Sequence, residues 1–206
     1  MNLSGVDDSQ IGSFLSVRLN FRRALSLPED RLVEQWNAAL YLSGEDDDEQ
    51  IIGNAHIVRC RISDPRVFDL LDALDGDLSA VASVVLDPVS GEPTGPVEDM
   101  LQGFGENFLI IDRVEMLPGW RGRGLGRWFA AEVIEVLSDG GTFVATYASP
   151  MDESEGTERR RVESKLKGVW GDIGFEPVSG NVMVLDLSLV TLSNKLEELR
   201  SGFGAQ

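Results

Sequence analysis

The stretch Val114-Glu-Met-Leu-Pro-Gly-Trp-Arg-Gly-Arg-Gly-Leu-Gly-Arg127 decides which fold and function this sequence predicts. The segment 108–117 that leads into it is typical of a strand, and the segment from Leu125 onward has the periodicity of an amphipathic helix. Glycines at 122, 124 and 126 carry no Cβ, so the backbone can approach a ligand closely there. Because the first amides of a helix are free donors at the positive end of its dipole, we predict an anion site with a pyrophosphate as ligand.

Three arginines, Arg121, Arg123 and Arg127, make this turn basic in a chain whose formal net charge is −17. Two other phosphate-binding turns fit less well. The Rossmann fingerprint needs G-x-G-x-x-G, whereas this turn reads G-x-G-x-G with Arg127 at the place of the third glycine. A Walker loop needs Gly-Lys-Ser/Thr, and this turn has no lysine.

The turn resembles the hallmark of the GNAT superfamily of acyl-CoA-dependent N-acyltransferases. Its pattern, Arg/Gln-x-x-Gly-x-Gly/Ala, is matched by Arg121, Gly124 and Gly126, with Pro118 three residues upstream of the arginine. The resemblance implies acetyl-CoA or another acyl-CoA as cosubstrate. With Cys60 and His56 as its one cysteine and one histidine, the chain has no plausible Cys/His zinc set, so no metal is expected. Backbone amides of 122–127 would hold the pyrophosphate, and the strand before them would pair with the pantetheine arm. The residues implied in cofactor binding are Val114, Met116, Arg121, Gly122, Arg123, Gly124, Leu125, Gly126 and Arg127.

The segments on either side predict an α/β fold. Alternation over 13–22 predicts a strand, and the runs 36–43 and 51–62 predict a β-hairpin around the polar tip 44–49. A short helix is expected to start at 27–31, two helices to fill 64–86 with a break at Gly76, and a loop to cover 87–107. After the turn we expect a helix that ends before Gly140, followed by a strand at 142–148. A second helix should then carry an apolar face made of Val162, Leu166, Val169, Trp170 and Ile173. A hairpin around Ser179-Gly180 and a helix at 189–200 complete the expected order.

Taken with the resemblance, this order implies an α+β fold of GNAT type, in which a mixed, mainly antiparallel central sheet is flanked by helices. We expect one domain over 1–206, with an insertion at about 64–107. In the family the helices usually precede the hairpin, whereas here a helical stretch lies between the hairpin and the motif strand. We expect this insertion to shape the acceptor pocket, with its loop 87–107 mobile enough to act as a cover.

Transfer of an acyl group to an amine requires a group that takes the amine proton. The candidates are Asp112 and Glu115 on the motif strand; the alternative for each is an ordinary surface acid. Alternation places Asp112 on the same face as Val114 and Met116, and Glu115 on the other face. His56 is interpreted as a structural histidine, with a role as base as the alternative.

The family often has an aromatic hydroxyl, which protonates the leaving thiolate, in the helix before a Gly-Phe pair. Here that position holds Trp170, which has no acidic hydroxyl, and the alternative for it is a core aromatic. The leading hypothesis is therefore an enzyme, an N-acetyltransferase in which the amine attacks acyl-CoA directly in a ternary complex. The runner-up is a non-catalytic acyl-CoA-binding or sensing module.

The composition of the chain limits the classes of partner that it can bind. A net charge of −17 opposes binding to nucleic acid and favours a cationic amine, on a small molecule or a protein, as the acceptor. The chain has one cysteine, Cys60, which we expect to be buried, and it shows neither a secretory leader nor a long apolar run, so a cytoplasmic protein without membrane contact is expected. The sequence does not decide whether the protein forms a homodimer.

The run Arg159-Arg-Arg161 is either a solvated cluster balanced by glutamates or a contact for the 3′-phosphate of CoA.

Overall fold

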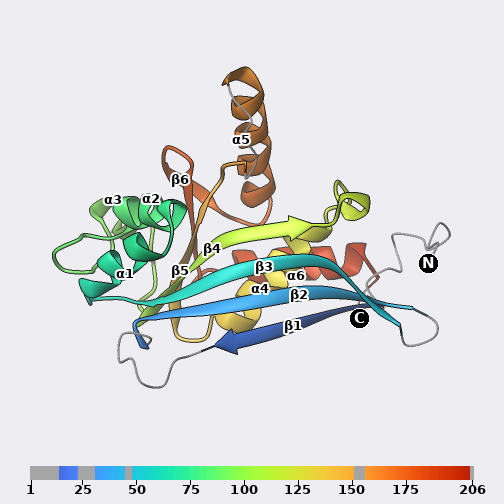
Figure 1. The fold of residues 1–206 in the computed structure, drawn as a ribbon. Coiled ribbons are helices and arrows are strands. Elements are labelled where there is room, and N and C mark those ends of the chain that lie inside the picture. Colours follow the sequence, from blue (N-terminus) through green and yellow to red (C-terminus); the bar gives the residue numbers. More distant parts are fainter. Residues whose placement is uncertain (1–13, 23–30, 45–47, 151–155, 205–206) are drawn as a thin grey trace.

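A computed structural model describes residues 14–22, 31–44, 48–150 and 156–204. The chain forms one seven-stranded sheet with helices on both faces (Figure 1). Its strands are β1 (Leu15–Arg22), β2 (Val33–Ser43), β3 (Glu49–Arg61), β4 (Asn107–Met116), β5 (Gly141–Tyr147), β6 (Glu176–Ser179) and β7 (Val182–Asp186). Its helices are α1 (Arg66–Leu74), α2 (Gly76–Val85), α3 (Gly95–Glu98), α4 (Leu125–Leu137), α5 (Gly156–Gly171) and α6 (Thr191–Gly202), with a 3₁₀ turn η3 (Pro118–Trp120).

The strand order is β1-β2-β3-β4-β5-β7-β6. Each neighbouring pair is antiparallel except β4 and β5, which run parallel. The helix α4 joins these two strands, as a parallel pair requires a crossover connection. The expected fold class, a mixed and mainly antiparallel sheet flanked by helices, is therefore confirmed.

The predicted hairpin is β2 and β3, which pair from Val33 opposite Cys60 to Ser43 opposite Glu49. Part of its polar tip, residues 45–47, lies outside the described residues. So does most of the helix start expected at 27–31, because 23–30 are not described. The strand expected at 13–22 is confirmed as β1, which pairs with β2 at one edge of the sheet.

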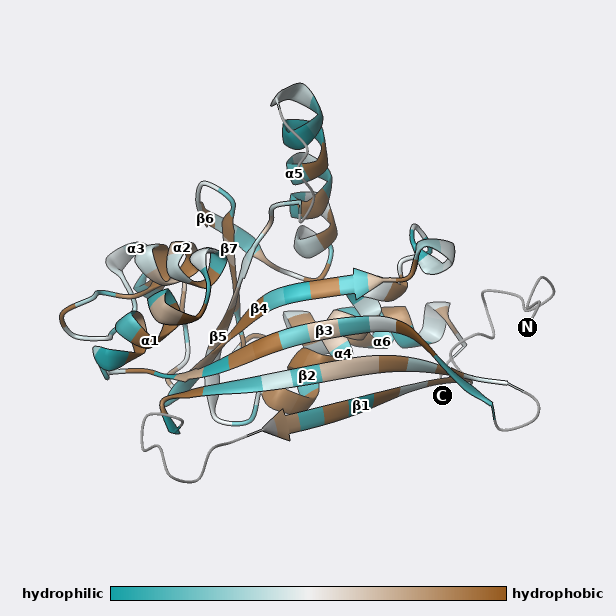
Figure 2. Ribbon diagram, in the orientation of Figure 1, coloured by the Kyte–Doolittle hydropathy of each residue, from teal (hydrophilic) through white to brown (hydrophobic). Residues whose placement is uncertain are grey.

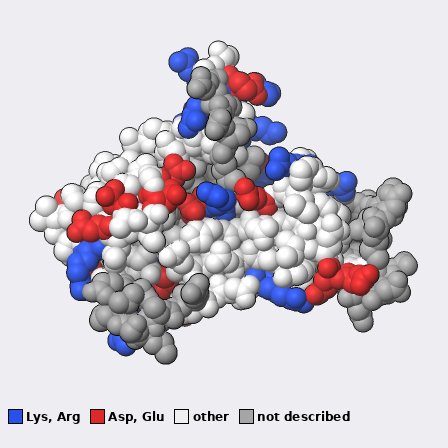
Figure 3. Space-filling model, viewed as in Figure 1, with Lys and Arg blue, Asp and Glu red and all other residues white. Residues whose placement is uncertain are grey.

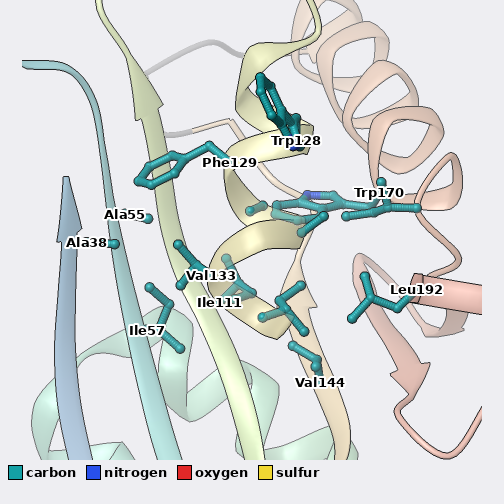
Figure 4. Packing of buried hydrophobic residues seen from close by; sticks show 14 of the residues in the cluster. Ala38, Ala55, Ile57, Ile111, Trp128, Phe129, Val133, Val144, Trp170 and Leu192 are labelled. Atoms are coloured by element: carbon teal, nitrogen blue, oxygen red, sulfur yellow. The ribbon is translucent and has the colours of Figure 1, made fainter. Parts of the chain in front are cut away.

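Apolar side chains alternate between the two faces of the sheet, as strand geometry dictates. On one face, Ile57, Ile111 and Val144 pack with Phe129 and Val133 of α4 in a core that also includes α6 (Figure 4). On the other face, a second core joins Val58, Ile110 and Ala145 to the helices α1 and α2. In Figure 2 teal and brown segments accordingly follow one another along β3 and the outer half of β4.

The helical insertion covers only one end of the second face (Figure 1). As predicted, Gly76 lies at the break between its two helices, and Asp75 caps α2 by accepting a hydrogen bond from the amide of Asp77 at 2.8 Å. The other half of this face, over β1 to β4, is left without a covering helix (Figure 1) among the residues described.

The loop expected at 87–107 is anchored, which contradicts its expected mobility. Val97, in the short helix α3, is fully buried, and Leu86 forms an isolated β-bridge with Pro93. The amide of Gln102 donates to the carboxylate of Asp186 at 2.8 Å. This anchoring joins the loop to the end of the sheet at which β4 and β5 begin, because Glu106 also donates from its amide to Gly140.

The expected helix before the Gly-Phe pair is confirmed as α5, but its apolar face is only partly covered. Of its 16 residues, all described, only Trp170 is buried. Figure 1 shows the helix extending away from the sheet, so its first turns meet little of the core. The hairpin β6–β7 and the final helix α6 follow as predicted.

Candidate functional site

The strands β4 and β5 separate halfway along β4. Their parallel pairing runs from Asn107 opposite Gly141 to Ile111 opposite Thr146 and stops there. The hydroxyl of Thr146 donates to the carbonyl of Ile111 at 3.0 Å and closes the last pair. β4 continues for five more residues, to Met116, paired with β3 alone. Its free edge and the end of β5 thus border an opening in the sheet.

Backbone groups of β4 face this opening. The amide of Leu117 donates to the carbonyl oxygen of Ile52 in β3 at 2.9 Å, so the backbone hydrogen-bonding groups of Leu117 point toward β3. Because these groups alternate in direction along an antiparallel strand, those of Val114 and Met116 point the opposite way, into the opening. Both side chains pack against the core under α4. The backbone that the sequence predicts for the pantetheine arm is therefore at the edge of the opening.

The glycine turn lies at the end of β4 and leads directly into α4. Gly122 and Gly124 have φ of 78° and 81°, in the left-handed region that favours glycine. Gly124 is also the N-cap of α4, and because glycine has no side chain to cap the helix, the amides of its first turn remain available to a ligand. The side chain of Leu125, at the first helical position, is buried, so this residue can contact a ligand only through its backbone.

Two of the three arginines of the turn serve the turn itself. The Nε of Arg121 donates to the carbonyl oxygen of Met116 at 2.8 Å, which fastens the turn to the end of β4. The guanidinium of Arg123 lies over the ring of Trp120, 5.1 Å from its centroid, a cation–π arrangement. These contacts keep two positive charges beside the amides of the turn.

Arg127 points the other way, toward the end of α5. Its guanidinium pairs with the carboxylate of Asp172 at 2.7 Å, and its Nε is buried without a hydrogen-bond partner among the described residues. A cavity of about 610 Å³ opens beside this pair, between the start of α4, the end of α5 and α6. Arg127 thus lies between the glycine turn and this cavity.

A β-bulge lies where the opening begins. His56 of β3 pairs with Arg113 and Ile57 pairs with Ile111, so β4 has one additional residue, Asp112, at this point. The Nδ1 of His56 lies 2.8 Å from Oδ2 of Asp112, with 24% and 12% of the two side chains exposed. The two residues stand 56 positions apart in the chain, so their pairing is not visible in the sequence.

The bulge overturns the expected face of Asp112, whereas Glu115 lies on the face that was expected. Strict alternation placed Asp112 with Val114 and Met116, but those two side chains face α4 while Asp112 bonds His56 on the other face. By alternation Glu115, which is exposed, lies on this second face as well. The two candidate acids are thus on one face, the face that α4 does not cover.

The first turn of α2 adds acidic residues near the bulge. Partial burial raises the pKa of the Asp77 carboxyl, the charges of Asp75 and Asp112 raise it further, and Arg113 and Arg159 lower it. Figure 3 shows acidic side chains gathered over α1 and α2, and basic side chains on α5 and beside the turn after β4. The insertion therefore approaches the bulge through α2 and not through the loop 87–107.

Trp170 is a core residue. It is 9% exposed, and its ring meets that of Phe175 edge to face, with centroids 5.2 Å apart. Figure 4 shows it extending from the base of α5 toward α4. Tyr147 ends β5 directly after Thr146 and packs against the core of the second face. The chain has two tyrosines. The other, Tyr41 of β2, has its ring under the guanidinium of Arg18 of β1.

The arginine run at the start of α5 is balanced by acids. Arg159 pairs with Glu163 at 3.1 Å and donates to the hydroxyl of Ser149 at 2.7 Å. Arg161 pairs with Glu158 at 2.6 Å. These contacts favour the interpretation as a solvated, balanced cluster.

No protein-family profile matches the chain, and no curated protein matches it. Among solved structures, a tyrosine-to-phenylalanine mutant of KacT is 12% identical, covers 90% of this chain and 99% of its own, and has a TM-score of 0.45. AtaT complexed with acetyl-methionyl-tRNAfMet is 12% identical over 90% of this chain and 98% of its own, with a TM-score of 0.42. A mutant AtaT toxin bound to the C-terminus of the antitoxin AtaR and acetyl-CoA is 12% identical over 94% and 98%, with a TM-score of 0.42. Similarity at this level assigns neither a ligand nor an acceptor to this chain.

The chain's own topology settles its fold. One parallel pair in a mainly antiparallel sheet separates just before a bulge, and the longer of its strands ends in a glycine turn that opens a helix. A strand, glycine turn and helix within a mixed, mainly antiparallel sheet are what the resemblance of the turn implies, and the chain accordingly has a GNAT-like fold.

Proposed function

We propose that this protein is an N-acyltransferase that moves an acetyl or related acyl group from acyl-CoA to an amine by direct attack. The observation that carries the proposal is the separation of β4 from β5 beyond Ile111 and Thr146, next to the glycine turn. An opening with free strand backbone on one side suits an amide-containing arm, and helix amides at its end suit a pyrophosphate.

The residues around the opening fit acyl-CoA. The amides of 122–127 would hold the pyrophosphate, with Arg121 and Arg123 adding charge, and the backbone of Val114 and Met116 would pair with the pantetheine arm. The cavity beside Arg127 has room for the far, nucleotide end of the molecule. The thioester would then lie near the bulge, where the opening begins.

The acidic residues of β4 supply the base chemistry in this proposal. Asp112 and Glu115 are on the face from which an amine can approach, because α4 and its core occupy the other face. A carboxylate there assists removal of the amine proton. The acids of α2 beside the bulge favour an acceptor with positive charge, on a small molecule or a protein.

Tyr147 is proposed as the proton donor for the leaving sulfur. A phenol can give a proton to a thiolate, and Tyr147 ends β5 at the mouth of the opening. This would replace the hydroxyl that Trp170 cannot provide.

The alternative is a non-catalytic acyl-CoA-binding module. The buried, hydroxyl-free Trp170 favours it, because proton donation is then missing from the helix where the family often places it. Binding of CoA is common to both functions, whereas transfer to an amine belongs to the enzyme alone.

The test has two parts. Calorimetry with CoA compares the wild type with Gly124→Val, which forces a β-branched residue to φ 81° and blocks close approach of the backbone. Gly119→Val is the control, because a Cβ at this position of the same turn meets nothing within 4 Å in the described part of the chain. Acetyl-CoA with a panel of amines then reports transfer by mass spectrometry. Unchanged CoA affinity in Gly124→Val would rule out the site, and CoA binding without transfer to any amine would favour the binding module.

A further inference from the structure

We infer that His56, held by Asp112, is the residue that takes the proton from the acceptor amine, and that its Nε2 is the accepting atom. The inference rests on the proposed function and adds to it a residue from β3, a strand that the glycine turn does not touch. It assigns Asp112 the role of positioning residue for the imidazole.

The hydrogen bond between the two side chains fixes which ring nitrogen is free. An ionised carboxylate can only accept, so at 2.8 Å from Oδ2 of Asp112 the Nδ1 of His56 carries the hydrogen. In the neutral ring, Nε2 then has a lone pair and is the basic atom. The carboxylate also stabilises the imidazolium that forms when Nε2 takes a proton.

The position of the pair suits this role. His56 is on β3 directly opposite Arg113, the first residue of β4 after the bulge, and the pairing of β4 with β5 ends one residue before the bulge, at Ile111. Neighbouring strands are about 4.8 Å apart, so the imidazole stands one strand away from the opening. The ring keeps 24% of its surface exposed, on the face that α4 leaves open. An amine that approaches this face therefore meets His56.

The surroundings of the imidazole are mixed in charge. On β2 it pairs with Asn37, which is neutral. Besides Asp112, the charged groups beside the bulge include Arg113 and Glu115 of β4, Asp75 and Asp77 of α2, and Arg159 of α5. The carboxylates favour both the imidazolium and an incoming ammonium, and the two arginines oppose them.

The chemical step balances with these residues. Nε2 takes one proton from the ammonium and leaves a neutral amine with a lone pair. The amine nitrogen then bonds to the carbonyl carbon of the thioester, the carbon–sulfur bond breaks, and the sulfur leaves with the bonding pair. The second proton of the nitrogen passes to the sulfur through the hydroxyl of Tyr147, which gives an amide and a free thiol. The imidazolium returns its proton to the solvent.

The test is the variant His56→Asn, whose amide stands near the place of Nδ1 and can still donate to Asp112 but cannot take up a proton. The rate constant kcat/KM is measured with the best amine of the panel from about pH 5.5 to 9. We expect a loss of about 10²-fold or more at pH 7 and loss of the acid-side ionisation. The defect should narrow at higher pH, where more of the amine is already neutral, and added imidazole should restore part of the rate. CoA affinity, measured separately, should stay within about twofold, because the glycine turn is untouched.

Asn37→Ala is the matched control: it changes an exposed residue directly opposite His56 on β2 and should leave the pH profile unchanged. The inference is overturned if His56→Asn keeps its acid-side ionisation and stays within about threefold of the wild type. If that variant does not fold, as judged by circular dichroism, Asp112→Asn decides. Its acid-side ionisation should move to lower pH, and an ionisation that does not move overturns the inference. A wild type that binds CoA and acetylates no amine would instead contradict the proposed function, and this inference with it.

Discussion

The guanidinium of Arg121 reaches back five residues and donates from its Nε to the carbonyl oxygen of Met116, the last residue of β4, at 2.8 Å. This bond joins the two parts of the proposed acyl-CoA site, the strand edge that faces the opening and the glycine turn that follows it. The arginine of the motif is thus a structural element of the turn, in addition to being a positive charge beside it.

Replacing Arg121 by alanine should weaken CoA binding by about tenfold. The reason is that the variant loses both a charge-assisted hydrogen bond and a charge near the pyrophosphate, together about 1.5 kcal/mol. Calorimetry measures the effect, with Lys165→Ala as a control that removes an exposed charge from α5. Equal losses in the two variants would mean that net charge alone matters.

The variant Tyr147→Phe should lower kcat by about tenfold or more and leave CoA affinity within about twofold, because only the hydroxyl is removed. Pre-steady-state kinetics with acyl-CoA analogues that have better thiol leaving groups provide the measurement. Such analogues need less help from an acid, so they should recover much of the rate. Tyr41→Phe, on the distant part of β2, is the control.

Salt should weaken the use of a cationic acceptor. With a net charge of −17 and acidic residues of α2 beside the bulge, attraction of a cation is expected to raise kcat/KM at low ionic strength. Raising salt to about 0.5 M shortens the screening length to a few ångström, so kcat/KM for the cation should fall while a neutral amine of similar size should change little. Parallel salt dependence for both amines would contradict the electrostatic argument.

The thiol of Cys60 should be unreactive in the native protein. It is 1% exposed, and burial raises its pKa well above the ordinary value, so little thiolate is available. A disulfide reagent should label it only after unfolding. An assay that follows the release of free CoA with such a reagent would then carry no background from the protein, and rapid native labelling would show that this core opens.

Asp77→Asn should stabilise the protein slightly at neutral pH. Because the folded pKa of Asp77 is raised, the folded state favours the protonated form, and the favourable contribution is lost as pH rises through that pKa. The amide variant avoids the cost of the charge, so we expect a small rise in Tm at pH 7, limited by the solvent exposure of the side chain. The difference should shrink as pH falls and vanish well below the ordinary pKa of an aspartate, where the wild-type carboxyl is protonated in both states. Thermal unfolding followed by circular dichroism at both pH values measures it.

Local patterns predicted most of this fold, and the failures have identifiable physical causes. Alternation over β2 and β3 and the break at Gly76 were readable because each depends on neighbours in the sequence. The bulge at Asp112 was not, since an additional residue in one strand becomes visible only when its partner strand is known. For that reason the face of Asp112 was predicted wrongly and its pairing with His56 was missed.

The loop 87–107 was also predicted only in part, because its contacts with distant residues are not visible in the local sequence. Its proline, glycine and acidic residues correctly predicted an irregular segment, but composition does not tell whether such a segment is anchored. Burial of Val97 and the bond from Gln102 to Asp186 depend on residues that are distant in the chain. A deletion within this loop would therefore disturb the core, and α2 is the better place to test for acceptor preference.

The sparse packing of α5 has a consequence for how the protein opens in its native state. α4 buries eight of its 13 residues, so exposing its amides to exchange with solvent requires disruption of the core. α5, longer by a turn, is joined to the core through Trp170 and the partly buried Leu166, and Lys167 donates to the carbonyl of Gly180. Arg159 joins its first turn to Ser149, just after β5. We therefore expect the turns between Arg159 and Leu166 to unfold as a separate unit at a free-energy cost below that of global unfolding. In deuterium labelling, these amides should exchange ahead of those of α4, and the protein would have a local opening reaction beside the mouth of the sheet while the sheet itself stays closed.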